Sequence, residues 1–366
     1  MSDKEEVAKT EIPALTGIRA LAAYLVFAHH YTAEPYLPNL SVWENILHQG
    51  YIGVSIFFTL SGFLITYRYE GNLSRRTLGQ YFWNRFCRIY PLYFLLSLVT
   101  FAYENTWGLR TIFYNLTLLK GFSINWTFTG IGQSWSLTVE ECFYAAAPII
   151  WLLSRRIGLA GVTLAIYGVG IALFWFGSWI SCDGFFMGIR LFTGYTFFGR
   201  CFDFIVGVFL ARLWRDRQST GNVSPKRTES SLSFTNLGLL GIFSIMVFFS
   251  NTHEMGIFDS TGLPVHNFLL PIMTAILFWG LLTEITILGR LLGSSVGRLL
   301  GRSSYAFYLV HAGLLQIYYL NPIFGAGWQY PRMAQFVAYN LIAIALYLLI
   351  EMPIHRFLKK LVVFSK

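Results

Sequence analysis

The chain has 366 residues, of which 55% are apolar and only 12% are charged, about half the charged share of an ordinary soluble domain. Its 34 Phe, 21 Tyr and 11 Trp residues are spread along the whole length, and its 33 Gly, 11 Pro and 4 Cys residues exclude a disordered chain, a collagen-like repeat and a disulfide scaffold. The composition therefore argues against a water-soluble enzyme and predicts a polytopic helical membrane protein, in which the net charge of +9 does not point to nucleic acid.

A helix needs about 20 residues to cross the hydrocarbon layer of a membrane. Ten apolar stretches of that order, each bounded by charged or turn-forming residues, predict an all-α bundle of about ten transmembrane helices. In chain order they cover residues 14–33, 50–67, 86–103, 135–153, 158–180, 197–213, 232–250, 267–283, 304–320 and 334–352. The segments 111–122 and 183–196 fit re-entrant or interfacial positions.

Basic residues favour the cytoplasmic ends of membrane helices. If the N-terminus is cytoplasmic, most of the 27 Lys and Arg residues lie on the cytoplasmic side. Those on the outer side are Arg110, Lys120, Arg190, Arg200 and Arg332. This asymmetry predicts that both termini are cytoplasmic.

The charged segment before the first predicted helix, residues 1–11, is not followed by a small-residue cleavage site, so we expect a retained helix and not a signal peptide. The polar stretch 215–231 predicts a cytoplasmic linker. We expect a single membrane domain over residues 1–366. The two halves show no repeat, which weakens an inverted-repeat transporter interpretation.

A charge inside a bilayer costs several kcal/mol, so ionisable residues at membrane depth are candidates for function. Arg19 and His30 are 11 positions apart in the first predicted helix, which places them on one helix face, about 16.5 Å apart along the axis. His29 lies about 80° away from that line. Taken alone, the pattern is more typical of an interfacial arginine and a hydrogen-bonded core histidine.

Arg85 and Arg88 are three positions apart near the cytoplasmic end of the third predicted helix, which suits them to a diphosphate. An isolated pair of this kind is more often a membrane anchor.

Glu140 and Glu141 are adjacent near the outer end of the fourth predicted helix, so at least one of them must face the bundle. Pairing with an arginine such as Arg200 is the structural alternative.

His311 is expected near mid-membrane in the ninth predicted helix, where a histidine is more often a core residue than a catalyst.

Taken together and in this order, the segments resemble the acyltransferase 3 family of integral membrane acyltransferases. The matching pieces are Arg19 and His30; residues 53–65 (GVSIFFTLSGFLI); Arg85, Arg88, Tyr90 and Pro91; residues 135–144 (WSLTVEECFY); residues 200–207 (RCFDFIVG); residues 304–311 (SYAFYLVH); and Glu351, Pro353 and Arg356. Each piece is weak alone, but the set is highly specific.

The resemblance implies an O-acyltransferase that moves an acyl group, usually acetyl, from cytoplasmic acyl-CoA to a hydroxyl. The acceptor is commonly a sugar of a surface polysaccharide, lipopolysaccharide or glycolipid. No metal is expected. The expected partners are the lipid bilayer and the carbohydrate or glycolipid acceptor, with a second copy of the chain or a polysaccharide assembly complex as further candidates, and no nucleic acid. The expected location is a bacterial inner membrane.

Residue by residue, the resemblance implies three groups of site residues. The catalytic group consists of His30, Arg19, Glu140 and Glu141, with His30 as the catalytic histidine and one of the glutamates facing the acceptor. The donor-binding group consists of Arg85, Arg88, Tyr90 and Ser61, and the further candidates are His311, Asp203, Arg200 and Trp135.

Two positions depart from the family pattern, because Asp203 stands where Glu is frequent and Cys142 where Gln is frequent. Both departures leave the expected reaction unchanged but bear on the acceptor. The chain ends soon after the tenth predicted helix, so we expect no appended extracytoplasmic hydrolase domain.

The expected mechanism places the diphosphate of acyl-CoA at the arginine pair and the pantetheine arm, comparable in length to the Arg19–His30 spacing, along the first helix. His30 removes the proton of the acceptor hydroxyl, or it forms an acyl intermediate itself. Arg19 and the hydroxyls of Ser55, Thr59 and Ser61 are alternatives for stabilising the oxyanion. A transporter with buried His and Glu residues is the alternative function, but it leaves the arginine pair unexplained.

Overall fold

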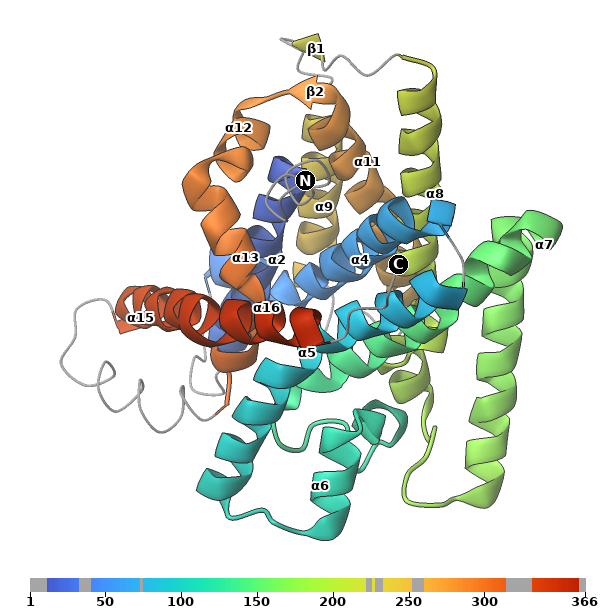
Figure 1. Cartoon of the computed structure of the whole chain (residues 1–366), viewed down its shortest axis with the longest axis vertical. Coiled ribbons are helices and arrows are strands. Elements are labelled where there is room, and N and C mark those ends of the chain that lie inside the picture. Colours follow the sequence, from blue (N-terminus) through green and yellow to red (C-terminus); the bar gives the residue numbers. More distant parts are fainter. Residues whose placement is uncertain are drawn as a thin grey trace. The chain divides into compact units, whose positions relative to one another are not determined.

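The computed structural model describes residues 12–32, 41–72, 75–221, 226–227, 233–251, 260–313 and 331–361. These residues are mostly helical, with a parallel pairing of two short strands, β1 (Lys226–Arg227) and β2 (Glu284–Ile285) (Figure 1), and an isolated antiparallel bridge between Ser123 and Phe185. The expectation of a helical fold is confirmed. The contacts divide the chain into a first unit, residues 1–71 and 202–304, and a second unit, residues 72–201 and 305–366.

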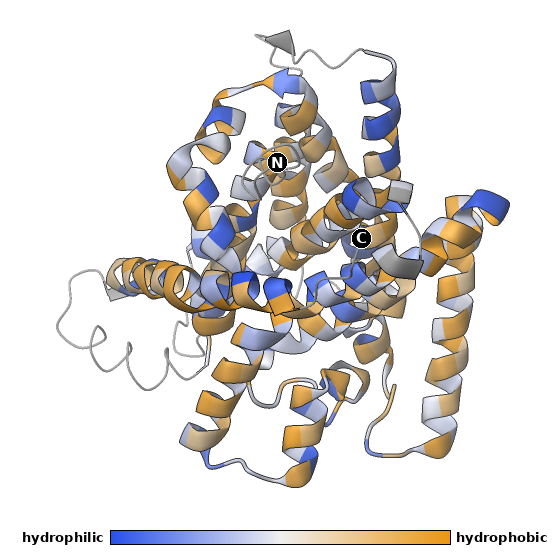
Figure 2. Cartoon of the chain, in the orientation of Figure 1, coloured by the Kyte–Doolittle hydropathy of each residue, from blue (hydrophilic) through white to orange (hydrophobic). Residues whose placement is uncertain are grey.

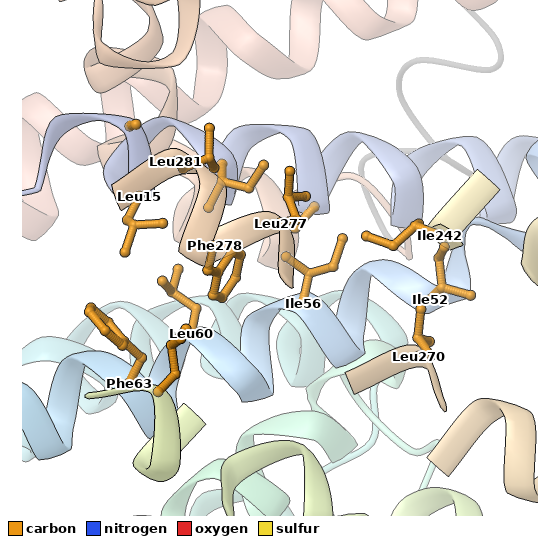
Figure 3. Close-up of a cluster of buried hydrophobic side chains, with 14 of the residues drawn as sticks. Leu15, Ile52, Ile56, Leu60, Phe63, Ile242, Leu270, Leu277, Phe278 and Leu281 are labelled. Atoms are coloured by element: carbon orange, nitrogen blue, oxygen red, sulfur yellow. The ribbon is translucent and has the colours of Figure 1, made fainter. Parts of the chain in front are cut away.

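The helices of the first unit pack around a buried apolar cluster. They are α2 (Pro13–Thr32), α3 (Val42–His48), α4 (Gly53–Tyr69), α9 (Phe234–Ser250), α10 (Gly262–Pro264), α11 (Leu270–Thr283) and α12 (Ile287–Gly293), with the short helical segments η1 (Gln49–Ile52) and η7 (Val265–Leu269). Figure 3 shows Leu15 of α2, Ile56 and Leu60 of α4, and Leu277 and Phe278 of α11 within this cluster. Because lipid is itself apolar, such a core stabilises a membrane protein through close packing more than through exclusion of water.

Two glycines let α4 approach α8 (Phe197–Ser219) closely. A Cβ atom on Gly62 would lie 2.2 Å from the carbonyl oxygen of Phe204, and one on Gly207 would lie 2.2 Å from that of Thr59. The rings of Phe58 and Phe204 stack with their centroids 4.8 Å apart. The two sequence motifs 53–65 and 200–207 therefore form one helix–helix contact through small residues, as membrane helices commonly do.

The end of α4 is fastened to α8 by Glu70, whose side chain is nearly buried. Arg212 donates to its Oε1 through Nε at 2.9 Å and Nη2 at 2.6 Å, and Arg215 donates to its Oε2 at 3.0 Å. Arg215 also donates to the carbonyl oxygens of Thr66 at 2.7 Å and Tyr67 at 3.2 Å. The guanidinium of Arg215 thus caps the last turn of α4.

The helices of the second unit vary widely in length. They are α5 (Arg75–Glu104), α6 (Leu109–Leu116), α7 (Trp135–Ile180), α15 (Pro331–Leu346) and α16 (Met352–Leu361), with the short segments η3 (Leu119–Phe122), η4 (Gly132–Ser134), η5 (Leu191–Tyr195) and η9 (Tyr347–Glu351). The helix α13 (Ser295–Val310) begins within the residues of the first unit and ends within those of the second. The helix α5 begins well before the predicted residue 86, because its first turns are polar and a hydropathy pattern finds only the apolar part.

The fourth and fifth predicted helices, residues 135–153 and 158–180, are the two halves of α7. They meet at Gly158, whose φ of 72° and ψ of 169° are not helical. Figure 2 shows α7 as largely apolar along both halves and hydrophilic at the bend between them. The predicted break is therefore present.

Among the described residues, five helical stretches are long and apolar enough to cross a membrane: Val42–Tyr69, Thr77–Glu104, Gly132–Ile180, Gly262–Thr283 and Arg332–Leu361. Ten spans and cytoplasmic termini stay predictions. The linker predicted at 215–231 overlaps α8 up to Ser219, and residues 222–225 and 228–232 lie outside the described residues, as do residues 1–11 and 314–330.

Candidate active site

The helix α2 carries Arg19 and His30 without interruption, so their predicted spacing on one helix applies. Both side chains are half-buried, and both residues belong to the first unit. The neighbouring His29 is engaged elsewhere, since its Nδ1–H donates to the carbonyl oxygen of His48 at 2.5 Å and its ring centroid lies 4.9 Å from that of His48. A hydrogen bond to the backbone of the first unit therefore accounts for His29.

Asp203 and Ser55 contact one another inside the first unit. The hydroxyl of Ser55 donates to the carboxylate of Asp203, and both side chains are fully buried. The hydroxyl proton of Ser55 is therefore engaged in a hydrogen bond to Asp203, which weakens Ser55 as a donor to an oxyanion. The hydroxyl of Thr59, one turn further along α4, is also buried and has no hydrogen-bond partner among the described residues. Ser61 is half-buried.

Arg85 and Arg88 lie on α5 in the second unit, and aromatic rings support both guanidinium groups. Arg88 forms an ion pair with Glu351, whose side chain is 3% exposed while that of Arg88 is 26% exposed. The guanidinium carbon of Arg88 lies 5.9 Å from the ring centroid of Tyr305, and that of Arg85 lies 5.7 Å from the ring centroid of Tyr144. Cation–π contacts of this kind contribute about 0.5–2 kcal/mol each. Packing thus holds the two guanidinium groups in place.

The two glutamates of α7 come close to this arginine pair. The hydroxyl of Tyr144 donates to Glu140, while the ring of Tyr144 faces Arg85, and the positive charge of Arg85 acts on Glu141. This differs from the expectation that the glutamates and the arginines occupy opposite ends of the bundle. The reason is the early start of α5 at Arg75, which places Arg85 about 15 Å along the helix and not at its end.

The remaining candidates of the second unit have structural contacts. The hydroxyl of Tyr90 donates to the carbonyl oxygen of Leu116 at 2.9 Å. The rings of Trp135 and Tyr195 meet edge to face at 4.8 Å, and the charge of the buried Arg200 acts on the same tyrosine. Trp135 and Arg200 thus share one neighbour.

His311 does not lie inside a helix as predicted, because α13 ends at Val310. Its side chain is fully buried and its Nδ1 lies 3.1 Å from the carbonyl oxygen of Phe307. The helix ends here for two reasons: Gly313 adopts a left-handed φ of 96°, and the side-chain amide of Gln133 supplies donors to the end of α13. These donors satisfy the carbonyl oxygens of Tyr308 at 3.0 Å, Leu309 at 3.1 Å and Ala312 at 3.3 Å.

Comparison with known sequences identifies the protein family. Residues 12–352 match the profile of a family described as an acyltransferase domain. The chain belongs to the acyltransferase 3 family.

Several curated proteins are similar to this member of the acyltransferase 3 family. YrhL of Bacillus subtilis is 26% identical over 331 residues, which cover 82% of this chain and 48% of the relative. The peptidoglycan O-acetyltransferase OatA of Listeria monocytogenes is 25% identical over 339 residues, covering 84% and 50%, and the acyltransferase MdmB of Streptomyces mycarofaciens is 29% identical over 185 residues, covering 44% and 45%. The chain spans about half the length of these relatives. No solved structure matches it.

Sequence reasoning missed the role of Lys120, which it treated as one of the outer basic residues. The side chain is fully buried, and its ammonium donates to the carbonyl oxygens of Thr129 and Ile131 and to the hydroxyl of Ser134, the last two at 2.9 and 3.0 Å. Burial lowers the pKa of the Lys120 ammonium to about 7, and the charge of Glu104 opposes this shift. A single lysine within the apolar segment 111–122 was the available signal.

Sequence reasoning also gave no role to Glu351 and Tyr305, although both lie in matching segments of the acyltransferase 3 family. The structure brings both to Arg88, and the hydroxyl of Tyr305 donates to the carbonyl oxygen of Ile89 at 2.8 Å. Their partners are more than 200 residues away along the chain, so no local pattern predicts these contacts.

Proposed function

We propose that this integral membrane protein is an O-acyltransferase that moves an acyl group, acetyl in the first instance, from acyl-CoA to a hydroxyl of a surface carbohydrate. The observation that carries the proposal is the pair of guanidinium groups of Arg85 and Arg88, held on one helix by aromatic rings and by Glu351. Planar guanidinium groups suit a diphosphate, because each can donate two parallel hydrogen bonds to phosphate oxygens.

The proposed acceptor is a sugar of a polysaccharide, lipopolysaccharide or glycolipid. Support comes from the relative OatA, which is named a peptidoglycan O-acetyltransferase. The proposed location is a bacterial inner membrane, in which a cytoplasmic thioester and a surface glycan are separated by the bilayer that the protein spans.

His30 is the proposed general base. It takes the proton of the acceptor hydroxyl while the hydroxyl oxygen attacks the thioester carbonyl; the carbon–sulfur bond then breaks, and the thiolate leaves and recovers a proton from the imidazolium. In the alternative route His30 first accepts the acyl group itself. Thr59 is the favoured hydroxyl for the oxyanion, together with Arg19 and Ser61, because its hydroxyl is buried and lacks a partner among the described residues.

Membrane vesicles of known orientation, prepared from cells that make the protein, test the proposal. We expect label from acetyl-CoA to enter the carbohydrate or glycolipid fraction only when the cytoplasmic face is exposed to the donor. Vesicles containing the His30→Ala variant provide the control. Label that enters the carbohydrate equally in both orientations would contradict the proposed sidedness, and label that never leaves coenzyme A would contradict the activity.

A further inference from the structure

The helix α16 runs antiparallel to the part of α5 that carries the arginine pair. At one point Arg88 forms its ion pair with Glu351, immediately before α16, and at another the indole Nε1 of Trp83 donates to the carbonyl oxygen of Leu358 at 3.1 Å. Moving toward the start of α5 therefore means moving toward the end of α16. All of these residues belong to the second unit.

The residues of α16 that follow Glu351 at helical spacing are His355 and Lys359, of which Lys359 is cationic. Glu351, His355 and Lys359 recur every four positions, which places them on one helix face. The positive charge of Lys359 acts on both Cys87 of α5 and His355. The helix face of α16 that begins at Glu351, the partner of Arg88, thus continues along α5.

The electrostatic surroundings of His355 are positive. The charged groups that act on it are Lys359, Arg88, Arg85 and Arg356, all of them cations. Arg356 and Lys359 are exposed, and His355 is half-buried. A cluster of like charges is destabilising by itself, and a bound anion with several negative charges relieves that repulsion.

We propose that α16 supplies a second phosphate subsite, formed by His355, Arg356 and Lys359, for the 3′-phosphate of the coenzyme A donor; this rests on the proposed function. Coenzyme A carries a diphosphate in its middle and a separate monophosphate on the ribose at its far end. The arginine pair of α5 suits the diphosphate, and the cations of α16, further toward the start of α5, suit the monophosphate. The three residues of this subsite all follow residue 352, at which the match to the family profile ends.

Binding of coenzyme A and of dephospho-coenzyme A, which lacks only the 3′-phosphate, tests the subsite on the purified full chain in detergent. We expect the wild-type protein to bind coenzyme A about tenfold more tightly, because one charge-assisted contact changes affinity by about that factor. Lys359→Gln and Arg356→Gln should each remove most of this preference by weakening coenzyme A alone. Arg156→Gln is the matched control, since Arg156 is an exposed cation of α7 and is not part of α16.

Three results would overturn the subsite. Equal affinity of the wild-type protein for the two ligands would do so, as would equal weakening of both ligands by Lys359→Gln. Equal effects of Arg356→Gln and Arg156→Gln would also overturn it, because they would show that a cation outside α16 acts on the ligand just as strongly. If Lys359→Gln and Arg356→Gln instead change only the binding of the protein to anionic lipid vesicles, α16 is a lipid-binding helix and the subsite is wrong. Failure of the wild-type protein to bind either form of coenzyme A would contradict the proposed function itself.

Discussion

Arg88 and Glu351 form an ion pair between α5 and the segment that leads into α16, although they are 263 positions apart along the chain. The pair joins two of the segments by which the sequence resembles its family. A carboxylate beside an arginine that we propose as a donor ligand lowers the net positive charge, but it also fixes the plane of the guanidinium. We infer that Glu351 is a positioning residue for Arg88.

A double-mutant cycle measures this pair. We expect Arg88→Gln and Glu351→Gln each to lower the free energy of unfolding by about 1–3 kcal/mol, because each leaves a charged partner without its counter-ion. The two losses should not add, and the coupling should exceed about 0.5 kcal/mol, the usual error of additivity at distant sites. Thermal unfolding in detergent provides the measurement, and additive losses would contradict the pair.

Replacing either arginine of α5 by lysine should weaken coenzyme A binding although the charge is kept. The planar fork of Arg88 or Arg85 and its contact over a tyrosine ring are lost in Arg88→Lys and Arg85→Lys, and we expect the dissociation constant to rise about tenfold. Titration calorimetry with coenzyme A checks this result. Arg290→Lys on α12 serves as the control, and full affinity in both α5 variants would exclude bidentate binding.

Gln133 should be sensitive to the smallest possible change of its side chain. In Gln133→Glu an oxygen replaces the nitrogen that donates to three carbonyl groups at the end of α13. We expect the free energy of unfolding to fall by about 1–3 kcal/mol, because buried acceptors would then face a carboxyl oxygen. Gln80→Glu, an exposed position of α5, is the matched control. Equal melting temperatures for the two variants would contradict the capping role.

Lys120 predicts a specific dependence of stability on pH. Its pKa is lowered from 10.5 to about 7 in the folded chain, so between these values the unfolded chain binds a proton that the folded chain does not. The free energy of unfolding should therefore rise with pH across this window, by at most about 1.4 kcal/mol per pH unit. Below pH 7 Lys120 is protonated in both states, so this dependence on pH should be absent there.

Comparison with Lys120→Met isolates this effect. The difference in unfolding free energy between the wild-type protein and this variant should change between pH 7 and pH 10, while Lys360→Met, at an exposed position, should show no such change. A difference that is constant with pH would show that the buried ammonium keeps its ordinary pKa.

Much of the fold could be predicted from sequence because hydropathy reports the apolar stretches that form membrane helices. The bounds of α2 nearly coincide with the predicted 14–33, and the break within α7, at Gly158, follows Arg155 and Arg156, which interrupt the apolar pattern. The pattern failed at the start of α5 and the end of α13. In both places the boundary depends on polar residues and on a distant donor, Gln133, which hydropathy does not report.

The candidate site could be predicted only as a set of residue types. The sequence identified Arg85, Arg88, Glu140 and Glu141 but placed the two pairs at opposite ends of the bundle. Their actual neighbourhood depends on the hydroxyl and ring of Tyr144, which contact one member of each pair. Such an aromatic bridge has no signature in spacing, because its effect depends on how two helices pack.

The most direct test of the central claim separates donor binding from transfer in the His30→Ala variant. We predict that this variant binds acetyl-CoA with nearly wild-type affinity while transfer to surface glycans, measured by their mass before and after induction of the gene, falls by about 10²–10⁴-fold. His29→Gln, which keeps a donor for the carbonyl of His48, should retain transfer. Glycans that carry as many acetyl groups in His30→Ala cells as in wild-type cells would contradict the account.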